Sequence, residues 1–366
     1  MQYKDIDMSN LPKTIDAGLW ESFHIQGIAL DAKHEYIYYS FTTILVKADL
    51  TGKVVGFVGG LTGHLGCIAY NAEDGKIYGS IEYKHDSIGN GIAKNLGVTL
   101  ANENAFYIAI FDVDKIDRIG MDAEKDGIMK AVYLPEVVAD YEGEGSDGHP
   151  HHLACSGIDG TTFGPAFGTG RNGKSMLTVA YGIYGDLKRT DNDYQVLRQY
   201  DWRKFDDVAQ PLIQGEPHHS GLACEGRYLV YTGNTDWGIQ NLEYDAYTGD
   251  WFAAVYKGKK PGFPNQPLYI IDGAKAPEKQ LLRGVTPEEE GNVLFLKEAG
   301  NLHEESGVYS WDFPYGSTGL YSLGNGYFYV SQPRTVPLNA GMRKLQTSKI
   351  CLYRFTGEAP TGFELV

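Results

Sequence analysis

One short phrase recurs along this chain, and its spacing restricts the folds that the chain can adopt. A histidine opens four copies, a small residue usually follows three positions later, and an acid or amide closes each. These copies are His24-Ile-Gln-Gly-Ile-Ala-Leu-Asp31, His64-Leu-Gly-Cys-Ile-Ala-Tyr-Asn71, His152-Leu-Ala-Cys-Ser-Gly-Ile-Asp159 and His218-His-Ser-Gly-Leu-Ala-Cys-Glu225. A fifth, looser copy, Gly316-Ser-Thr-Gly-Leu-Tyr-Ser-Leu323, has glycine in place of the histidine. Repeats of this kind are typical of radial or solenoid architectures.

The residues between the copies predict two β-hairpins per repeat. Turn residues and a β-rich run follow most copies, as in 71–83 and 226–232. A second hairpin with Thr-Gly at its turn spans 45–57 and recurs at 242–254, and more loosely at 353–365. Glycine there supplies the positive φ of a tight turn. Two hairpins make the four strands of one propeller blade, so the sequence predicts an all-β fold, a β-propeller that forms one closed domain over 1–366.

The repeat also predicts the number of blades. Inner strands that begin near the five copies of the phrase give five blades. Six is the alternative, because the segment that begins at Asn241 has the features of an inner strand itself. The gap from His218 to Asn241 is too short for a whole blade, which favours five. The uneven spacing then requires an inserted loop or lid at 258–315, between blades four and five.

Long loops are predicted on one face of the propeller. Loops that enter inner strands and loops that join second and third strands share a face, and the repeat histidines lie there too. The longest predicted loops, 82–104, 139–151, 181–194, 258–315 and 332–348, all belong to this set. Long irregular loops on a rigid scaffold commonly carry binding residues. We therefore expect a functional site where this face meets the axis.

Four histidines on separate inner strands predict a metal site on the axis. Imidazole nitrogens bind Mn, Zn and Fe, and Ca is the further candidate for a divalent ion. Glycine in the fifth copy would leave an open side for water or substrate, as a catalytic metal requires. The alternative is that each histidine bonds a neighbouring backbone carbonyl and closes the channel. The predicted ligands are His24, His64, His152 and His218.

Polar and aromatic residues at the predicted ends of the second strands form a second candidate cluster. Glu82 or Tyr181 has the chemistry of an acid or base, and His219 that of a proton shuttle beside His218. Arg334 or Lys84 would hold a carboxylate, Arg334 bidentately. The predicted catalytic residues are Glu82, Tyr181, His219 and Arg334, and the predicted substrate-binding residues are Tyr83, Lys84, Asn234, Trp237 and Gln332.

These features predict a metal-dependent carbohydrate-active enzyme with one axial pocket. An acidic sugar would suit the cations, and the reaction would be β-elimination by a lyase or hydrolysis through metal-bound water. The alternative is a lectin-like, sugar-binding propeller without catalysis, but unequal blades and a single ring of histidines favour an enzyme. The arrangement resembles propeller enzymes that hold an axial ion with histidines, such as oligogalacturonate lyases and carotenoid oxygenases, and that resemblance implies the fold alone.

Charge and cysteine content bound the partners and the compartment. A net charge of −15 argues against nucleic acid and against an anionic membrane surface. No apolar run approaches the roughly 18 residues that span a bilayer, and no signal peptide is visible at the N-terminus. Four cysteines without a CxxC pair indicate reduced thiols. We expect a cytoplasmic protein, or a secreted one if a signal was trimmed, with a small-molecule or oligosaccharide substrate. The oligomeric state stays open.

Overall fold

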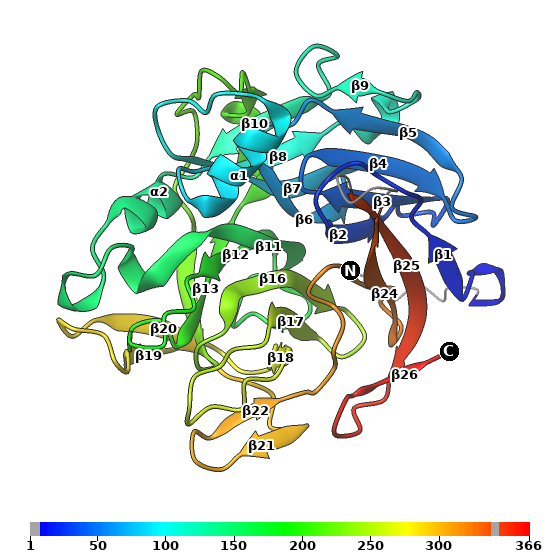
Figure 1. Ribbon diagram of the computed structural model, residues 1–366. Coiled ribbons are helices and arrows are strands. Elements are labelled where there is room, and N and C mark those ends of the chain that lie inside the picture. The colour runs from blue at the N-terminus through cyan, green and yellow to red at the C-terminus, as the bar shows by residue number, and fades with distance from the viewer. Residues whose placement is uncertain (1–7, 338–343) are drawn as a thin grey trace.

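Five sheets stand around a central axis in the computed structural model, which describes residues 8–337 and 344–366 (Figure 1). The prediction of an all-β, five-bladed propeller is confirmed. Blade one consists of β2 (Ile25–Leu30), β3 (Tyr36–Phe41), β4 (Ile44–Asp49), β5 (Val54–Gly59) and β9 (Met121–Asp122). Blade two consists of β6 (His64–Asn71), β7 (Lys76–Tyr83), β8 (Ala105–Phe111), β10 (Met129–Tyr133) and β14 (Gln210–Pro211).

The remaining blades follow in chain order. Blade three consists of β11 (Cys155–Pro165), β12 (Ser175–Ile183), β13 (Tyr194–Tyr200) and β15 (Gly226–Tyr231), extended by β20 (Glu290–Leu294) and β19 (Glu278–Leu281). Blade four consists of β16 (Asp236–Asp245), β17 (Asp250–Tyr256) and β18 (Leu268–Ile271). Blade five consists of β23 (Leu320–Ser322), β24 (Tyr327–Pro337), β25 (Lys344–Phe355), β26 (Phe363–Leu365) and β1 (Thr14–Asp16).

The ring is closed by hydrogen bonding between the two ends of the chain. Strand β1 runs antiparallel to β25, with Ile15 opposite Ile350. The first strand of the chain therefore completes a sheet built from the last strands, and the fold has no seam held by side-chain packing alone. Inner strands of neighbouring blades contact one another around the axis. Every residue of β11 is buried, as the innermost strand of a large blade requires.

Two α-helices occur in the described part of the chain. α1 (Ser87–Leu96) follows β7 directly, and α2 (Pro135–Glu142) follows β10. The side chain of Asp86 caps α1 by accepting from the amides of Ile88 and Gly89, and Gly97 ends the helix in the left-handed conformation. The cap fixes where α1 begins, and this places its first turns beside the axis.

The fourth inner strand differs from the prediction. It is β16, which contains Asn241, whereas His218 lies in a loop before β15, the fourth strand of blade three. The segment that had supported a six-blade count is thus the inner strand of blade four, and the total stays at five. The error arose because the His218 phrase precedes a genuine strand, but that strand lies fourth in its blade, between β13 and β20.

Two predicted loops also contain more regular structure than expected. The segment 258–315, predicted as an inserted loop or lid, carries β18 of blade four and the hairpin β19–β20, whose second strand lies parallel to β15. It also carries a small hairpin of β21 (Asn301–His303) and β22 (Val308–Ser310). The predicted loop 332–348 is mostly taken up by the paired strands β24 and β25, and residues 338–343 lie outside the described residues.

Candidate functional site

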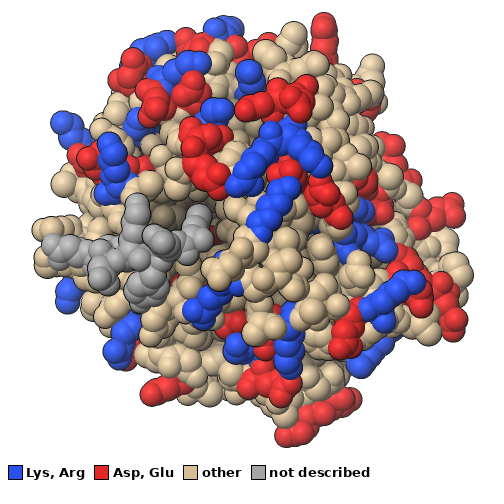
Figure 2. All heavy atoms as spheres, turned by 180° about the vertical axis from the view of Figure 1, so that it is seen from behind, with Lys and Arg blue, Asp and Glu red and all other residues tan. Residues whose placement is uncertain are grey.

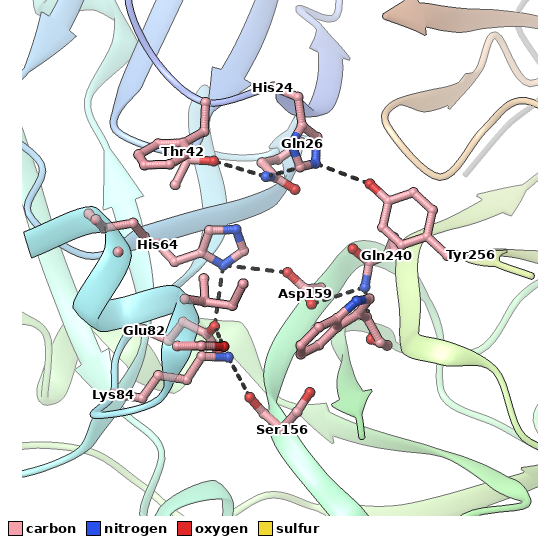
Figure 3. Close-up of a pocket in the computed structure, with 16 residues that line it drawn as sticks. His24, Gln26, Thr42, His64, Glu82, Lys84, Ser156, Asp159, Gln240 and Tyr256 are labelled. Atoms are coloured by element: carbon pink, nitrogen blue, oxygen red, sulfur yellow. Dashed lines mark hydrogen bonds and ion pairs between the residues drawn. The ribbon is translucent and has the colours of Figure 1, made fainter. Parts of the chain in front are cut away.

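A pocket of about 220 Å³ lies on the axis where the inner strands begin (Figure 3). This is the face on which the sequence predicted a site. Side chains from blades one to four and from the first turns of α1 form its wall. The lining residues are Phe23, His24, Gln26, Thr42, His64, Glu82, Lys84, Ser87, Ile88, Gly91, Ile92, Ser156, Asp159, Trp237, Gln240 and Tyr256.

β-Bulges near the start of four inner strands aim polar residues into this pocket. The pairing register shifts between Ile25 and Gly27 in β2 and between Leu65 and Ile68 in β6. It shifts again between Ile158 and Thr161 in β11 and between Ile239 and Asn241 in β16. A bulge turns its extra residue out of the regular alternation. The bulged residues Gln26, Asp159 and Gln240 all line the pocket.

His64 is the central titratable group of the site. Its Nδ1 atom lies 3.2 Å from Oε1 of Glu82 and 3.7 Å from Oδ1 of Asp159. The ring turns its other nitrogen, Nε2, toward the open centre of the pocket (Figure 3). Burial lowers the pKa of His64, but the hydrogen bond to Glu82 and the charge of Asp159 outweigh burial, so the net pKa is raised.

A buried ion pair supports His64 from below. Nζ of Lys84 lies 2.5 Å from Oε1 of Glu82, and the second oxygen of Glu82 accepts the amide hydrogen of Ile158 at 3.0 Å. Burial raises the pKa of Glu82, but the Lys84 charge outweighs it and the net pKa is lowered. Glu82 is therefore ionised. Because a carboxylate only accepts hydrogen bonds, the His64 proton lies on Nδ1.

Asp159 behaves differently from Glu82. Burial raises its pKa to about 7, and the neighbouring His64 charge opposes that rise. One oxygen, Oδ2, accepts from Nε2 of Gln240 at 3.1 Å, whereas Oδ1 has no hydrogen-bond partner among the residues that the structure describes. The pKa values of the two carboxyl groups in this pocket are therefore shifted in opposite directions, which is a common property of acid–base sites.

His24 and Tyr256 form a second pair on the opposite wall. The Tyr256 hydroxyl lies 3.1 Å from Nε2 of His24, and Nε2 of Gln26 lies 3.3 Å from the same atom. Burial, with a smaller contribution from His64, lowers the pKa of His24 to about 4. His24 is therefore neutral at pH 7, and its Nε2 accepts these hydrogen bonds.

Cys67 and Asn241 bond the inner strands to one another across the axis, and neither residue lines the pocket. Asn241 donates through Nδ2 to the backbone oxygens of Gln26 and Ser317, at 2.7 and 3.0 Å. Sγ of Cys67 contacts Oδ1 of Asn241 and the carbonyl of Thr161, both at 3.4 Å. These bonds connect segments of all five blades across the axis.

Trp237 adds an aromatic wall in an unusual backbone conformation. Its φ is +65°, in the left-handed region that a bulky residue rarely adopts. Strained residues of this kind cluster at ligand sites, where the surrounding structure holds them in place. The indole also packs edge-on against Tyr184, with ring centroids 5.9 Å apart. Ile88 and Ile92 of α1 and the ring of Phe23 complete an apolar side of the pocket.

The four predicted metal ligands do not meet at one point. His24 and His64 line the pocket, but His152 bonds Asp140 and Glu289, at 2.7 and 2.9 Å, and these bonds occupy both of its ring nitrogens. His218 accepts from the amide of Ser220 and packs on Tyr107. Within 8–337 and 344–366, no three His, Cys, Asp or Glu side chains gather in a group that could hold a metal ion.

The repeat position explains this difference. His24 and His64 lie two residues before a bulge, and the same positions in β11 and β16 are Gly157 and Gly238. His152 instead lies in a turn before β11, where Leu153 and Ala154 have positive φ. The histidine phrase therefore marks the axis in blades one and two alone.

Of the other predicted site residues, Glu82, Lys84 and Trp237 line the pocket and six do not. The Tyr181 hydroxyl points away from the pocket and bonds Asp140 and Arg198, at 2.7 and 2.6 Å. His219 is exposed and pairs with Glu103. Arg334 and Gln332 line a separate cavity beside β1. Tyr83 bonds Gln214 outside the axial pocket, and Asn234 is buried without lining it.

Among the lining residues that the sequence interpretation did not name, Asp159, Gln240 and Tyr256 matter most for the chemistry. Asp159 closes the third phrase, and the acid in that position was visible. Gln240 and Tyr256 belong to blade four, whose inner strand was misplaced. Correct placement of β16 would have identified both, since Tyr256 ends the second strand of that blade.

The surface offers two further observations. Lys and Arg side chains are interspersed with Asp and Glu on the face in Figure 2, and the described residues form no uniformly basic patch there. None of the helices in the described ranges has the length and apolar character needed to cross a membrane.

Comparisons with known proteins give remote structural likeness only. No protein-family profile and no curated protein sequence matches the chain. It is similar to the Dos1 propeller, with 9% identity, a TM-score of 0.35, and coverage of 85% of this chain but only 56% of that one. It is also similar to the PQQ domain of pyranose dehydrogenase from Coprinopsis cinerea, with 10% identity, a TM-score of 0.32, and coverage of 88% of this chain and 81% of that one. A third similar structure is the Cps50 (Swd1) β-propeller domain from Myceliophteria thermophila, with 10% identity, a TM-score of 0.30, and coverage of 88% of this chain and 83% of that one. The fold assignment therefore rests on the strand pairing, and the chain is a five-bladed β-propeller with one polar axial pocket.

Proposed function

We propose that this protein is a carbohydrate-active enzyme whose axial pocket binds one sugar ring and whose His64 transfers a proton. The observation that carries the proposal is the geometry of His64. Glu82 holds Nδ1 at 3.2 Å, and Nε2 turns toward the open pocket (Figure 3). An imidazole oriented by a carboxylate and open at its other nitrogen is the arrangement of a general base or acid.

The charges around His64 give each group a role. Ionised Glu82 fixes one proton on Nδ1, so the fraction of His64 that carries no second proton accepts a substrate proton at Nε2, and because the pKa of His64 is raised, this fraction grows as pH increases. Asp159, whose pKa burial raises to about 7, lies beside His64 and changes its charge near neutral pH. Positioned proton transfer of this kind contributes roughly 10²–10⁴ in rate.

The shape and chemistry of the wall support a sugar ring as the ligand. Phe23, Trp237 and Ile92 form an apolar side, and Gln26, Gln240 and Asp159 form a polar one. A sugar ring has the same division, with C–H groups on its faces and hydroxyls at its edge. The volume of about 220 Å³ lies below the usual range for drug-sized ligands, which suits one ring.

The expectation of an acidic substrate loses its basis. It depended on Arg334 and Lys84, but Arg334 lines a different cavity. Lys84 is 4% exposed, and its ammonium contacts Glu82, Asp86 and the carbonyl of Ser156. The lining residues therefore supply no free cation for a carboxylate.

Proton transfer by a single histidine suits the site better than hydrolysis by two carboxylates. Hydrolysis of that kind needs a free oxygen on each carboxyl group. Both oxygens of Glu82 are already bonded, Oε1 to Lys84 and His64 and Oε2 to the amide of Ile158. His64, through Nε2, and Asp159, through Oδ1, are the groups that still have an atom free to bond a substrate (Figure 3).

A glycan screen with matched variants tests the proposal. Products of elimination absorb near the ultraviolet edge, and hydrolysis is followed by new reducing ends. His64→Gln should lower kcat by at least about 10² and change sugar affinity much less. His219→Gln, which alters an exposed histidine outside the pocket, is the control and should keep full activity.

Two outcomes would contradict this function. Full turnover by His64→Gln would remove the proposed proton carrier. Sugar binding without any product, with wild-type protein and under all conditions tested, would establish the lectin-like alternative. A parallel assay after treatment with chelator tests metal dependence: because the proposed proton transfers use protein groups alone, turnover should persist.

A further inference from the structure

The amide and ammonium donors on the polar side of the pocket are almost fully used by the protein itself. Both amide hydrogens of Gln240 are engaged, by Oδ2 of Asp159 at 3.1 Å and by the carbonyl of Trp237 at 2.8 Å. Because both partners are acceptors, they must face the amide nitrogen of Gln240, and this leaves its side-chain oxygen, Oε1, available to a ligand. The Gln26 amide nitrogen likewise contacts Thr42 and His24, at 2.9 and 3.3 Å.

Lys84 adds no donor for a ligand. Its ammonium group carries three hydrogens and faces three oxygens, from Glu82 and Ser156 at 2.5 Å and from Asp86 at 3.5 Å. The polar wall therefore presents acceptors, namely the side-chain oxygens of Gln240 and Gln26 and the carboxyl group of Asp159. A ligand that satisfies this wall must bring donors.

Asp159 is the acceptor in greatest need of a partner. The residue is only 8% exposed, and its Oδ1 accepts no hydrogen bond from any described residue. Nδ1 of His64 is 3.7 Å away, beyond hydrogen-bond distance, and is already directed to Glu82. A buried carboxylate oxygen without a donor is costly, so it marks a place that a ligand group can fill.

The aromatic side chains of the pocket favour a positive charge on that ligand. Phe23, Trp237 and Tyr256 all line it. Aromatic faces attract ammonium groups, and the attraction increases where water is excluded. Carboxylates also outnumber permanent cations here, because Glu82, Asp86 and Asp159 surround the single ammonium of Lys84.

We infer that the sugar bound in the axial pocket carries a protonated amino group, which Asp159 recognises as its counter-ion. An ammonium group has three donors and no acceptor, which is the complement of this wall. The inference rests on the proposed function, because it names the substrate class of the same pocket. It replaces the acidic sugar by one of opposite charge.

The pairing should depend on pH. The groups that face Asp159 are His64 on β6, Glu82 and Lys84 at the end of β7, Gln240 on β16 and Tyr256 at the end of β17. Burial raises the pKa of Asp159 to about 7, so the carboxyl group is largely neutral at pH 6 and ionised at pH 8. Affinity for an ammonium group should therefore rise over this interval.

Calorimetry with three matched ligands tests the inference. 6-Amino-6-deoxyglucose, 6-acetamido-6-deoxyglucose and glucose share a ring and differ at one substituent, and the primary amine at C6 stays protonated at pH 8. At pH 8 the amino sugar should bind about tenfold or more tightly than either neutral sugar, as a charge-assisted hydrogen bond implies. The preference should shrink at pH 6 and disappear in Asp159→Asn. Asp193→Asn, which alters a buried aspartate paired with Lys260 outside the pocket, should keep it.

The outcomes separate this inference from the proposed function. Equal binding of all three sugars at pH 8 overturns the inference, and turnover that depends on His64 would then still support the enzyme. Preferential binding of the amino sugar without any product upholds the substrate class and overturns catalysis. If no sugar binds, both fail. Should Asp159→Asn not fold, the ligand series and its pH dependence on wild-type protein decide alone.

Discussion

Replacing Glu82 should reveal how much of the fold depends on the ion pair beneath His64. Glu82 is 2% exposed, and three groups bond it: Lys84 at 2.5 Å, the amide of Ile158 at 3.0 Å and His64 at 3.2 Å. Alanine would leave the Lys84 ammonium buried with an incomplete set of partners. Removing one member of a buried ion pair costs about 3–5 kcal/mol of unfolding free energy.

A matched control separates burial from charge. Glu73 pairs with Arg203 at 2.8 Å, but the Glu73 side chain is 52% exposed. An exposed pair contributes about 0–1 kcal/mol, so Glu73→Ala should change stability little. Urea unfolding at pH 7.5, followed by tryptophan fluorescence, measures the loss of unfolding free energy in each variant. The loss equals the shift in the urea midpoint multiplied by the slope m, the dependence of unfolding free energy on urea concentration. The double variant Glu82→Met, Lys84→Met should recover much of the loss, since it leaves no unpaired charge.

Equal costs for Glu82→Ala and Glu73→Ala would refute this reasoning. That result would mean that water reaches the pair and that Glu82 does not control His64. Titration of His64 by nuclear magnetic resonance provides a second measurement. Glu82→Gln should lower the pKa of His64, because the hydrogen bond and charge that now raise it would be weakened.

Three further predictions concern neighbouring positions. Asp159 has a pKa of about 7 in the folded protein and roughly 3.9 in the unfolded chain, so its stabilising effect is complete below pH 3.9 and is lost as pH rises through 7. The stability of Asp159→Asn relative to wild type should therefore increase between pH 4 and pH 7. A difference in urea midpoint that stays constant over this interval would contradict the prediction. A Cβ atom at Gly157 would lie 1.9 Å from Oε2 of Glu82, so Gly157→Ala should abolish turnover. Gly127 also has a positive φ, but no atom lies within 4 Å of its Cβ position, so Gly127→Ala should lower the unfolding free energy by about 1–2 kcal/mol and leave turnover unchanged. Asn241→Ala should cost roughly 1–3 kcal/mol by leaving two buried carbonyls without a donor, and an unchanged thermal midpoint would show that water replaces the amide.

The fold was predictable because its signals are local. Turn residues, β-rich runs and a repeated phrase recur at each blade, and each is readable within a dozen residues. The pairing partner of a strand is not local information. The strand after His218 has the composition of a second strand, yet it is the fourth strand of blade three and lies between β13 and β20. Composition alone does not distinguish that position from an inner one.

The parts of the site that were predictable lie at strand ends beside the axis. Glu82 and Lys84 line the pocket as expected because β7 keeps its alternation up to the axis, and His64 lines it because it opens β6, ahead of the bulge in that strand. Tyr181 failed by one residue: its neighbour Gly182 faces Asp159, and Tyr181 points into the blade. Asp159 enters the pocket through the bulge in β11, and no hydrophobic pattern encodes a bulge.

The bonds that Cys67 and Asn241 make across the axis have a consequence for the proposed sugar substrates. A polymer cannot thread between inner strands that are bonded to one another there, so a long glycan could present only its terminal unit to His64. Entry and departure would use the same mouth, and each turnover would have to end before the next chain end arrives. A pocket of this form favours release of single units from chain ends, or the use of free monosaccharides, over cleavage in the middle of a chain.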